Sequence, residues 1–333
     1  MKYLITLKPL EPYFFGSDLT FGKLGSKESG SYIAKSNYFP QQSTFLGALR
    51  NTIMNEVKNN YDEAKKLIGG SKFFIRSRDD EKFDFGAIKE ISNLFIEKDK
   101  NFYLPLKDIF SFKIEKDEEY IIKEYKPKEK KLQFYTAKEE KSIKLFRLDF
   151  KEDLELSDVF TEIELVGNSK KEKENAFFKK IAIRMEDDFR FAYRVEFESD
   201  FDLEKLDNKI IYFGGDRSKF LLNIKKDFHL EDFTATLREK LNQISDKNYI
   251  YLLNDSYINL NIKKHCDFAI THEIPFRYIS KSKKNHHLKS KQFYFYEKGG
   301  FFLDYDEELL KAIDKKYLQQ IGYNKFITRK EEK

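Results

Sequence analysis

Hydrophobic and polar residues alternate in several short segments of the chain, and this pattern predicts strands. The clearest segment is residues 189–197, in which every second residue is a large hydrophobic one. A period of two gives a strand one apolar face. Short apolar runs at 3–7, 209–213, 220–224 and 249–253 also predict strands, and residues 72–76 are expected to form a short strand.

Helical spacing is limited to a few segments. Phe45, Leu49, Ile53 and Val57 recur every four residues, and Ser43 and Thr44 before them are good N-cap residues. A second helical stretch ends at Gly69-Gly70, residues 233–244 carry an apolar stripe, and residues 306–320 predict a final helix.

The order of these elements favours an α+β fold. Strands pair as hairpins, including a predicted one over 292–305 around Gly299-Gly300, rather than as regular strand–helix–strand units. We therefore expect antiparallel sheets. The lysine-rich segment 168–174 is the best candidate for a linker or inserted loop, which divides the chain into domains 1–167 and 168–333.

Composition limits the class of protein. The 333 residues are 40% hydrophobic and 16% aromatic, enough to fill a core and to exclude disorder over most of the chain. No run approaches the roughly 18 apolar residues of a membrane helix, and the start does not read as a signal peptide. With one cysteine, Cys266, an internal disulfide is excluded. We expect a soluble cytoplasmic protein with no membrane partner.

Charge is nearly balanced, at 62 basic against 57 acidic residues, but it is unevenly distributed. Residues 29–55 and 274–296 contain no Asp or Glu, and the second window includes Lys281, Lys283 and Lys284. A polyanion-binding face requires such acid-free segments, since carboxylates there would repel phosphate. The alternative is that these windows are solvated loops.

Catalytic motifs are missing from the sequence. It has no phosphate-loop pattern, no dinucleotide fingerprint and no nucleophile elbow. Cys266 with His265 and His272 lacks a fourth zinc ligand. His286-His287 could act as acid and base on RNA, although a basic loop that only touches phosphate is the simpler interpretation. We expect no catalytic residues, no metal and no cofactor.

A glycine loop, Gly214-Gly215-Asp216-Arg217, lies between two predicted strands. Two glycines permit positive φ and close approach of a ligand, and the exposed amides of such a loop can bind an anion. Arg217 and Lys219 would add charged donors. The alternative is an ordinary hairpin turn.

Residues 35–50 combine a proline turn with the start of a helix. Free amides at a helix start bind phosphate, and aromatic rings such as those of Tyr38 and Phe39 stack on unpaired bases. Alternatively, this is a helix whose aromatic residues belong to the core. The RNA-binding candidates of this segment are Lys35, Asn37, Tyr38, Gln42, Ser43, Thr44 and Arg50.

Three stretches together make the chain recognisable: "LKPLEPYFF … YIAKSNYFPQQSTFLGALRNTI", "VGN … AIRMEDDFRFAYRVEF" and "IIYFGGDRSKFLL". Their order resembles the RAMP superfamily of CRISPR effector proteins, and within it the third subunit of the type III-B Cmr complex. Gln41-Gln42 replace the family's usual prolines, Asp216 replaces its Glu, and a C-terminal "GxG" signature is reduced to Gly322-Tyr323-Asn324.

The resemblance implies two ferredoxin-like (RRM-like) domains with long insertions. It also implies a non-catalytic subunit that binds the 5′ tag of the CRISPR RNA and docks the large polymerase/cyclase subunit beside backbone RAMP subunits, meeting target RNA only indirectly. The tag-binding candidates it transfers are Ser43, Thr44, Arg50, Gly214, Gly215, Arg217 and Lys219. Two alternatives stay open: a metal-independent RAMP endoribonuclease that uses His286 or His287, and the equivalent subunit of another type III complex.

Overall fold

The computed structural model describes most of the chain, in places by its backbone alone. The described residues are 1–16, 20–21, 33–57, 60–70, 83–126, 131–134, 142–168, 177–214, 217–230, 232–277, 279–281, 287–289 and 291–329. The strand expected at 72–76 lies outside them.

The chain forms two compact units, each assembled from two separate segments. Unit 1 is Met1–Phe102 with Leu154–Leu230, and unit 2 is Tyr103–Asp153 with Glu231–Lys333. This division differs from one at residue 167/168 because the first strand pairs with strands from the second half of the chain. β1 (Lys2–Pro9) lies between β14 (Phe189–Phe197) and β16 (Ser218–Lys226) and is antiparallel to both.

The main sheet of unit 1 confirms the strand predictions. β5 (Phe95–Lys98), β14, β1, β16 and β15 (Lys209–Phe213) are neighbours in that order, and β4 (Ile88–Ile91) also pairs with β14. The predicted strands 189–197 and 209–213 have these same bounds, and those at 3–7 and 220–224 are longer than expected. Antiparallel pairing throughout this part supports the α+β class.

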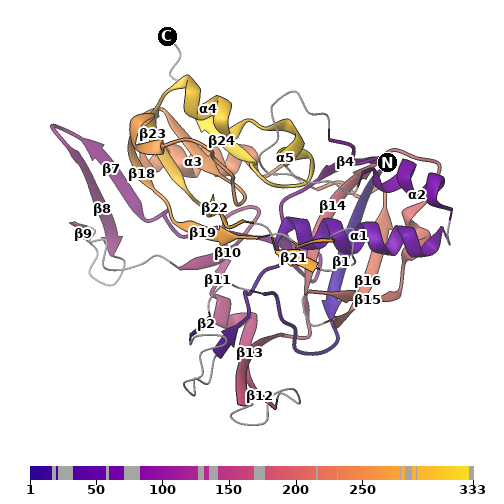
Figure 1. Cartoon of the computed structure of the whole chain (residues 1–333). Coiled ribbons are helices and arrows are strands. Elements are labelled where there is room, and N and C mark those ends of the chain that lie inside the picture. The colour runs from indigo at the N-terminus through magenta and orange to yellow at the C-terminus, as the bar shows by residue number, and fades with distance from the viewer. Residues whose placement is uncertain are drawn as a thin grey trace. The chain divides into compact units, whose positions relative to one another are not determined.

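Helix α1 (Gln42–Glu56) covers one face of this sheet (Figure 1). The buried Phe45 ring stacks on Tyr193 of β14, with ring centroids 3.7 Å apart. The predicted N-caps are wrong: Gln41 is the N-cap residue, and its carbonyl accepts hydrogen bonds from the amides of Thr44 and Phe45. Extended backbone at Gln41, directly after Pro40, starts the helix earlier than Ser43. Helix α2 (Tyr61–Ile68) follows and contacts α1.

A second sheet of unit 1 includes the strands on both sides of the segment 168–174, which the sequence left open as a linker or an inserted loop. β12 (Phe160–Asn168) pairs along its whole length with β13 (Phe177–Met185), so the segment after Asn168 connects two strands of one hairpin. β3 (Ile33–Lys35) runs parallel to β13 and pairs with β2 (Thr20–Phe21).

Unit 2 contains several small antiparallel sheets. β6 (Asn101–Lys107), β10 (Ile143–Arg147) and β11 (Asp153–Leu154) are neighbours, as are β7 (Phe112–Lys116), β8 (Tyr120–Lys126) and β9 (Lys131–Phe134). A four-stranded sheet has the order β18 (Cys266–Ile270), β23 (Phe301–Tyr305), β17 (Tyr249–Leu252), β24 (Phe326–Arg329). β19 (Glu273–Phe276) pairs with β22 (Phe293–Tyr296), and β20 (Ile279–Lys281) with β21 (His287–Lys289). Short 3-10 helices span Leu156–Asp158, Leu203–Leu206 and Ile262–Lys264.

Two predictions in unit 2 are wrong. The strands of the expected 292–305 hairpin belong to different sheets, because β22 pairs with β19 and β23 pairs with β17 and β18. The expected final helix is two helices, α4 (Glu307–Ile313) and α5 (Lys316–Gln320). Asp314 ends α4 with a non-helical ψ of 61°, and its carboxylate accepts hydrogen bonds from Lys316 and Gln319 of α5. α3 (Thr234–Ile244) forms as predicted.

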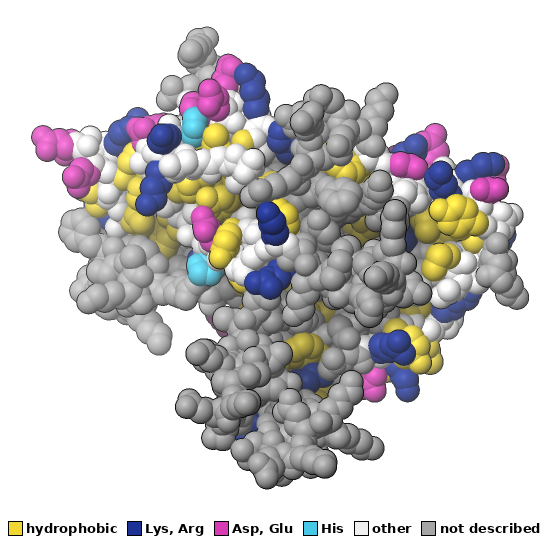
Figure 2. Space-filling model, viewed as in Figure 1, with side chains coloured by type: hydrophobic (Ala, Val, Ile, Leu, Met, Phe, Trp, Pro, Cys, Tyr) yellow, Lys and Arg dark blue, Asp and Glu magenta, His cyan; other side chains and the backbone are white. Residues whose placement is uncertain are grey.

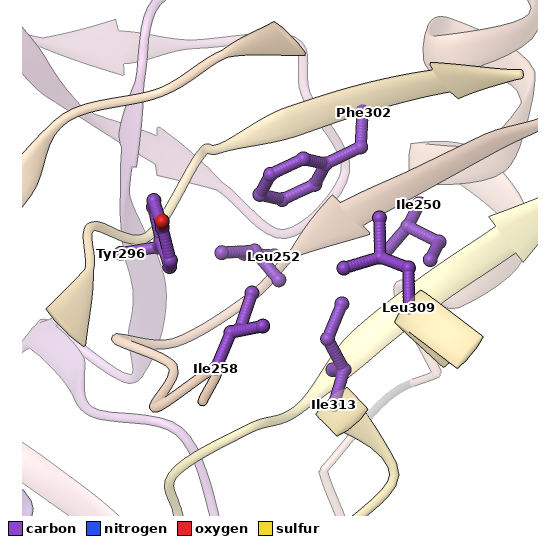
Figure 3. Packing of buried hydrophobic residues seen from close by; sticks show 7 residues of the cluster. All are labelled: Ile250, Leu252, Ile258, Tyr296, Phe302, Leu309 and Ile313. Carbon is purple, nitrogen blue, oxygen red and sulfur yellow. The ribbon is translucent and has the colours of Figure 1, made fainter. Parts of the chain in front are cut away.

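The core of unit 2 lies between α4 and the sheet strands β17 and β23. Leu309 and Ile313 of α4 point toward Ile250, Leu252 and Phe302, and all five are fully buried (Figure 3). On the face of the molecule in Figure 2, acidic and basic side chains are interspersed rather than gathered by sign. The described residues of that face therefore form no patch of a single charge.

Candidate nucleic-acid site

Residues 10–16, which we call the aromatic segment, lie at the centre of the candidate site in unit 1. Tyr13 exchanges two backbone hydrogen bonds with Ile183 of β13, at 2.8 and 2.9 Å. The Phe15 amide donates to Ser36 Oγ, and the Phe15 carbonyl accepts from the Asn37 amide. The rings of Tyr13 and Phe15 are buried against Phe191 of the main sheet. The aromatic segment therefore connects both sheets of unit 1 with residues 35–38.

One acid, Glu162, holds the side chains of Lys35 and Tyr38 in place. Glu162 of β12 accepts a hydrogen bond from Tyr38 at 2.5 Å, and the Lys35 ammonium lies 2.6 Å from the same carboxylate oxygen. The contacts from Lys35 and then Tyr38 lower the pKa of Glu162. Burial and this hydrogen bond raise the pKa of Tyr38 to about 12. Asn37 donates to the carbonyl of Gly16 at 3.2 Å.

The aromatic rings of this turn pack against the protein. Tyr38 and Phe39 both contact the buried Phe160 ring, each with centroids 5.5 Å apart. The two rings remain half-buried. The rings of Tyr38 and Phe39 therefore pack against the protein. This is the alternative to base stacking that the sequence left open.

The first turn of α1 follows directly. Gln42 is buried and its Oε1 has no hydrogen-bond partner among the described residues, while Ser43 and Thr44 are half-buried beside it. No acidic residue lies in this turn, so no carboxylate of the turn itself offsets the positive end of the helix dipole.

Arg50 lies two turns further along α1 and is engaged within unit 1. Its guanidinium lies over the Phe85 ring, 5.5 Å from the centroid, and donates to the carbonyl of Asp84 at 3.4 Å. Burial lowers the pKa of Arg50. These contacts give Arg50 a packing role, and its predicted contact with RNA stays a prediction.

The glycine loop joins β15 and β16 as a hairpin in which Phe213 pairs with Ser218. Gly214 has φ +92, and a Cβ there would lie 2.8 Å from the carbonyl oxygen of Phe14. A glycine is therefore required here because the backbone of the aromatic segment lies too close to leave room for a Cβ atom. Arg217 is exposed at φ +57, and the Lys219 amide donates to Glu11. Gly215 and Asp216 lie outside the described residues.

The aromatic segment thus brings together two motifs that are about 175 residues apart in the sequence. Residues 35–38 contact it through Phe15, and the glycine loop contacts it through Gly214. Lys180 of β13 adds a cation 4.5 Å from the centre of the Phe14 ring, and burial lowers its pKa. The sequence analysis assigned no site role to the stretch "PYFF" or to the strand around Lys180. These two features are what the sequence offers for predicting that the two motifs meet at the aromatic segment.

The remaining candidates lie in unit 2. Lys281 ends β20, with only its backbone described, and Lys283 and Lys284 fall between β20 and β21, outside the described residues. His286 is also outside them, and of His287 only the backbone is described. His265 contacts Asp306 at 2.8 Å. Burial is the main cause that raises the pKa of the Cys266 thiol to about 11.

The described residues include neither a metal-binding cluster nor a membrane-spanning helix. They contain no group of three or more His, Cys, Asp or Glu side chains arranged to hold a metal ion. None of their helices is long and apolar enough to cross a membrane.

Residues 5–276 match the family model described as CRISPR-associated protein (Cas_Cmr3). The chain belongs to this family. The resemblance inferred from the motifs at 35–50 and 214–219 is thereby confirmed, and the match includes both motifs and the aromatic segment. No curated protein sequence matches the chain.

Two solved structures are similar to the chain over nearly its full length. A chain of the type III-B Cmr-beta bound to cognate target RNA, solved by cryo-EM, is 16% identical with a TM-score of 0.52, over 99% of each chain. A chain of Cmr-beta bound to cognate target RNA and AMPPnP is 15% identical with a TM-score of 0.49, over 97% of this chain and 96% of that one. The first of these likenesses shows a common fold over nearly the full length.

Proposed function

We propose that the chain is a non-catalytic subunit of a type III-B CRISPR effector complex that binds the 5′ tag of the CRISPR RNA. The observation that carries the proposal is the convergence of residues 35–38 and the glycine loop on the aromatic segment of unit 1. Membership of the Cmr3 family supports the type III-B assignment. The two ferredoxin-like domains belong to the same proposal.

Phosphate is the part of the tag that this site would bind most directly. Lys35 belongs to residues 35–38 and the exposed Arg217 to the glycine loop, the two motifs that contact the aromatic segment, and the first turn of α1 contains no acid. Lys35 is held by Glu162, so its ammonium is oriented before RNA arrives. An oriented cation loses less conformational entropy on binding.

The double variant Lys35→Ala/Arg217→Ala tests the proposal. Each change removes one phosphate contact, so affinity for a 5′-tagged guide RNA should fall at least tenfold at 0.1 M salt, while the melting temperature stays within a few degrees. Lys311→Ala, an exposed lysine on α4 of unit 2, is the matched control. Affinity equal to that of the parent protein would contradict the assignment of this site.

Docking of the large polymerase/cyclase subunit is the second part of the proposal, supported by family membership alone. Co-purification with the large subunit and backbone RAMP subunits should yield a stable assembly. A guide-loaded complex that forms equally well without this chain would exclude the docking role.

The rival function, RNA processing, needs His286 or His287 as acid or base. Purified protein incubated with repeat RNA in chelator should leave the RNA intact, since no acid–base partner or metal group accompanies these histidines in the sequence. Discrete products that disappear in the variant His286→Ala/His287→Ala would establish the endoribonuclease instead.

A further inference from the structure

The main sheet of unit 1 has a second face, opposite to the one that α1 covers. Cross-strand partners lie on the same face of a sheet, so the register identifies its members. Tyr212 of β15 pairs with Lys219 of β16, Ile210 pairs with Leu221, and Leu221 pairs with Lys8 of β1. The alternation of burial along β15 and β16 agrees, because Phe213, Phe220 and Leu222 on the α1 side are buried.

This face, which we call the open face, exposes two large hydrophobic side chains. Ile210 and Tyr212 are each 64% exposed, on a strand that ends the sheet in the described part of the chain. The Tyr212 ring has no aromatic partner and its hydroxyl no hydrogen bond among the described residues. Leu10, 47% exposed, continues the apolar surface from the end of β1.

The three strands that form this face carry charges of one sign only. Strands β1, β15 and β16 contain six lysines and no Asp or Glu. Lys8, Lys219 and Lys225 belong to the open face by register, and no ion pair to any of them occurs within the described residues. Two acids outside these strands lie at the edge of the open face: Glu11 accepts a hydrogen bond from the backbone amide of Lys219, and Asp207 accepts one from the Asn223 side chain.

We infer that the open face of β1, β16 and β15 is a platform for single-stranded RNA, on which Tyr212 stacks a base while Lys219 and Lys8 contact phosphates. In sites for single-stranded nucleic acid, an exposed aromatic ring stacks on a base and a nearby cation contacts the phosphate, and Tyr212 and Lys219 are cross-strand partners. A protein partner fits less well, since lysine is depleted in protein interfaces. The inference rests on the proposed function and extends it: Tyr212 lies two residues before Gly214, so the strand bound at the glycine loop would continue over the open face.

A tryptophan reporter tests base stacking directly, because the chain contains no tryptophan. In Tyr212→Trp the single indole should be quenched by at least a third on titration with a 5′-tagged guide RNA, since a stacked base quenches it. Tyr61→Trp, at an exposed position on α2, is the matched control and should keep its fluorescence. Quenching of both indoles alike, or of neither while RNA binds, would overturn the inference.

Affinities complete the experiment. Tyr212→Ala should weaken binding about tenfold and Tyr212→Phe less than twofold, because stacking needs the ring and not the hydroxyl. Lys8→Gln/Lys219→Gln should reduce the slope of log affinity against log salt by about 1.4, because each lost phosphate contact on a single strand accounts for about 0.7. Unchanged RNA affinity in Tyr212→Ala, with loss of association with the large subunit, would show that the open face binds protein. If the parent protein binds no RNA at all, the proposed function fails first.

Discussion

Gly214 and Gly47 differ in what surrounds them, and this difference makes the glycine loop testable at the scale of a single residue. Gly214 has a positive φ and the Phe14 carbonyl within 2.8 Å of a built Cβ, whereas Gly47 lies in α1 with nothing within 4 Å. Gly214→Ala should therefore lower the free energy of unfolding by about 1–3 kcal/mol. Gly47→Ala should raise it by about 0.5–1 kcal/mol, because alanine is the better helix former. Urea unfolding measures both, and a neutral Gly214→Ala would show that the loop does not depend on this approach.

Glu162 gives the site a defined response to pH. Because contacts with Lys35 and Tyr38 lower the pKa of its folded-state carboxyl, its contribution to stability is complete above the pKa of the unfolded chain. That contribution is lost as the pH falls through the lower, folded-state pKa. The difference in melting temperature between the parent protein and Glu162→Gln should be largest near pH 7. It should disappear below about pH 4. A difference independent of pH would mean that Glu162 acts through packing alone.

At the scale of elements, the β7–β8 hairpin is attached to the four-stranded sheet of unit 2 by a small polar cluster. Lys116 contacts Asp267 at 2.7 Å and Asp304 at 3.1 Å, and the Tyr120 hydroxyl donates to Asp304 at 2.6 Å. The Tyr120 ring also stacks on Phe268, with centroids 5.0 Å apart.

Asp304→Asn should loosen this attachment, since it removes the charge that Lys116 and Tyr120 share but tolerates the positive φ at this position. Amides of β7 and β8 should exchange with solvent about tenfold faster, while β17 stays protected. Glu307→Gln, in an exposed pair on α4, should change neither strand and serves as the control. Unchanged exchange in β7 and β8 would mean that the Tyr120–Phe268 stack alone holds the hairpin.

The sequence predicted strands well where one face is buried, as at 189–197, because alternation is a local signal. It failed where partners are distant. The chain around Asn324 is held by hydrogen bonds to Tyr257 and Ile313, and nothing near it in sequence indicates this. The sequence predicted the two motifs of the site separately. It did not predict that the aromatic segment joins them, because the contacts between them are distant in the chain.

At the scale of the whole molecule, RNA binding should depend strongly on salt, because exposed lysine and arginine side chains are what the site offers. Affinity for single-stranded RNA should drop at least tenfold between about 50 and 200 mM salt. Fluorescence anisotropy across this range measures the slope. Salt-independent binding would contradict a site built on phosphate contacts.

The most direct test of the central claim compares two guide RNAs that differ only in the 5′ repeat-derived tag. A subunit that binds the tag should bind the tagged guide at least tenfold more tightly than the same guide with the tag removed, and Lys35→Ala/Arg217→Ala should abolish that preference. Equal affinity for both guides in the parent protein would contradict the account.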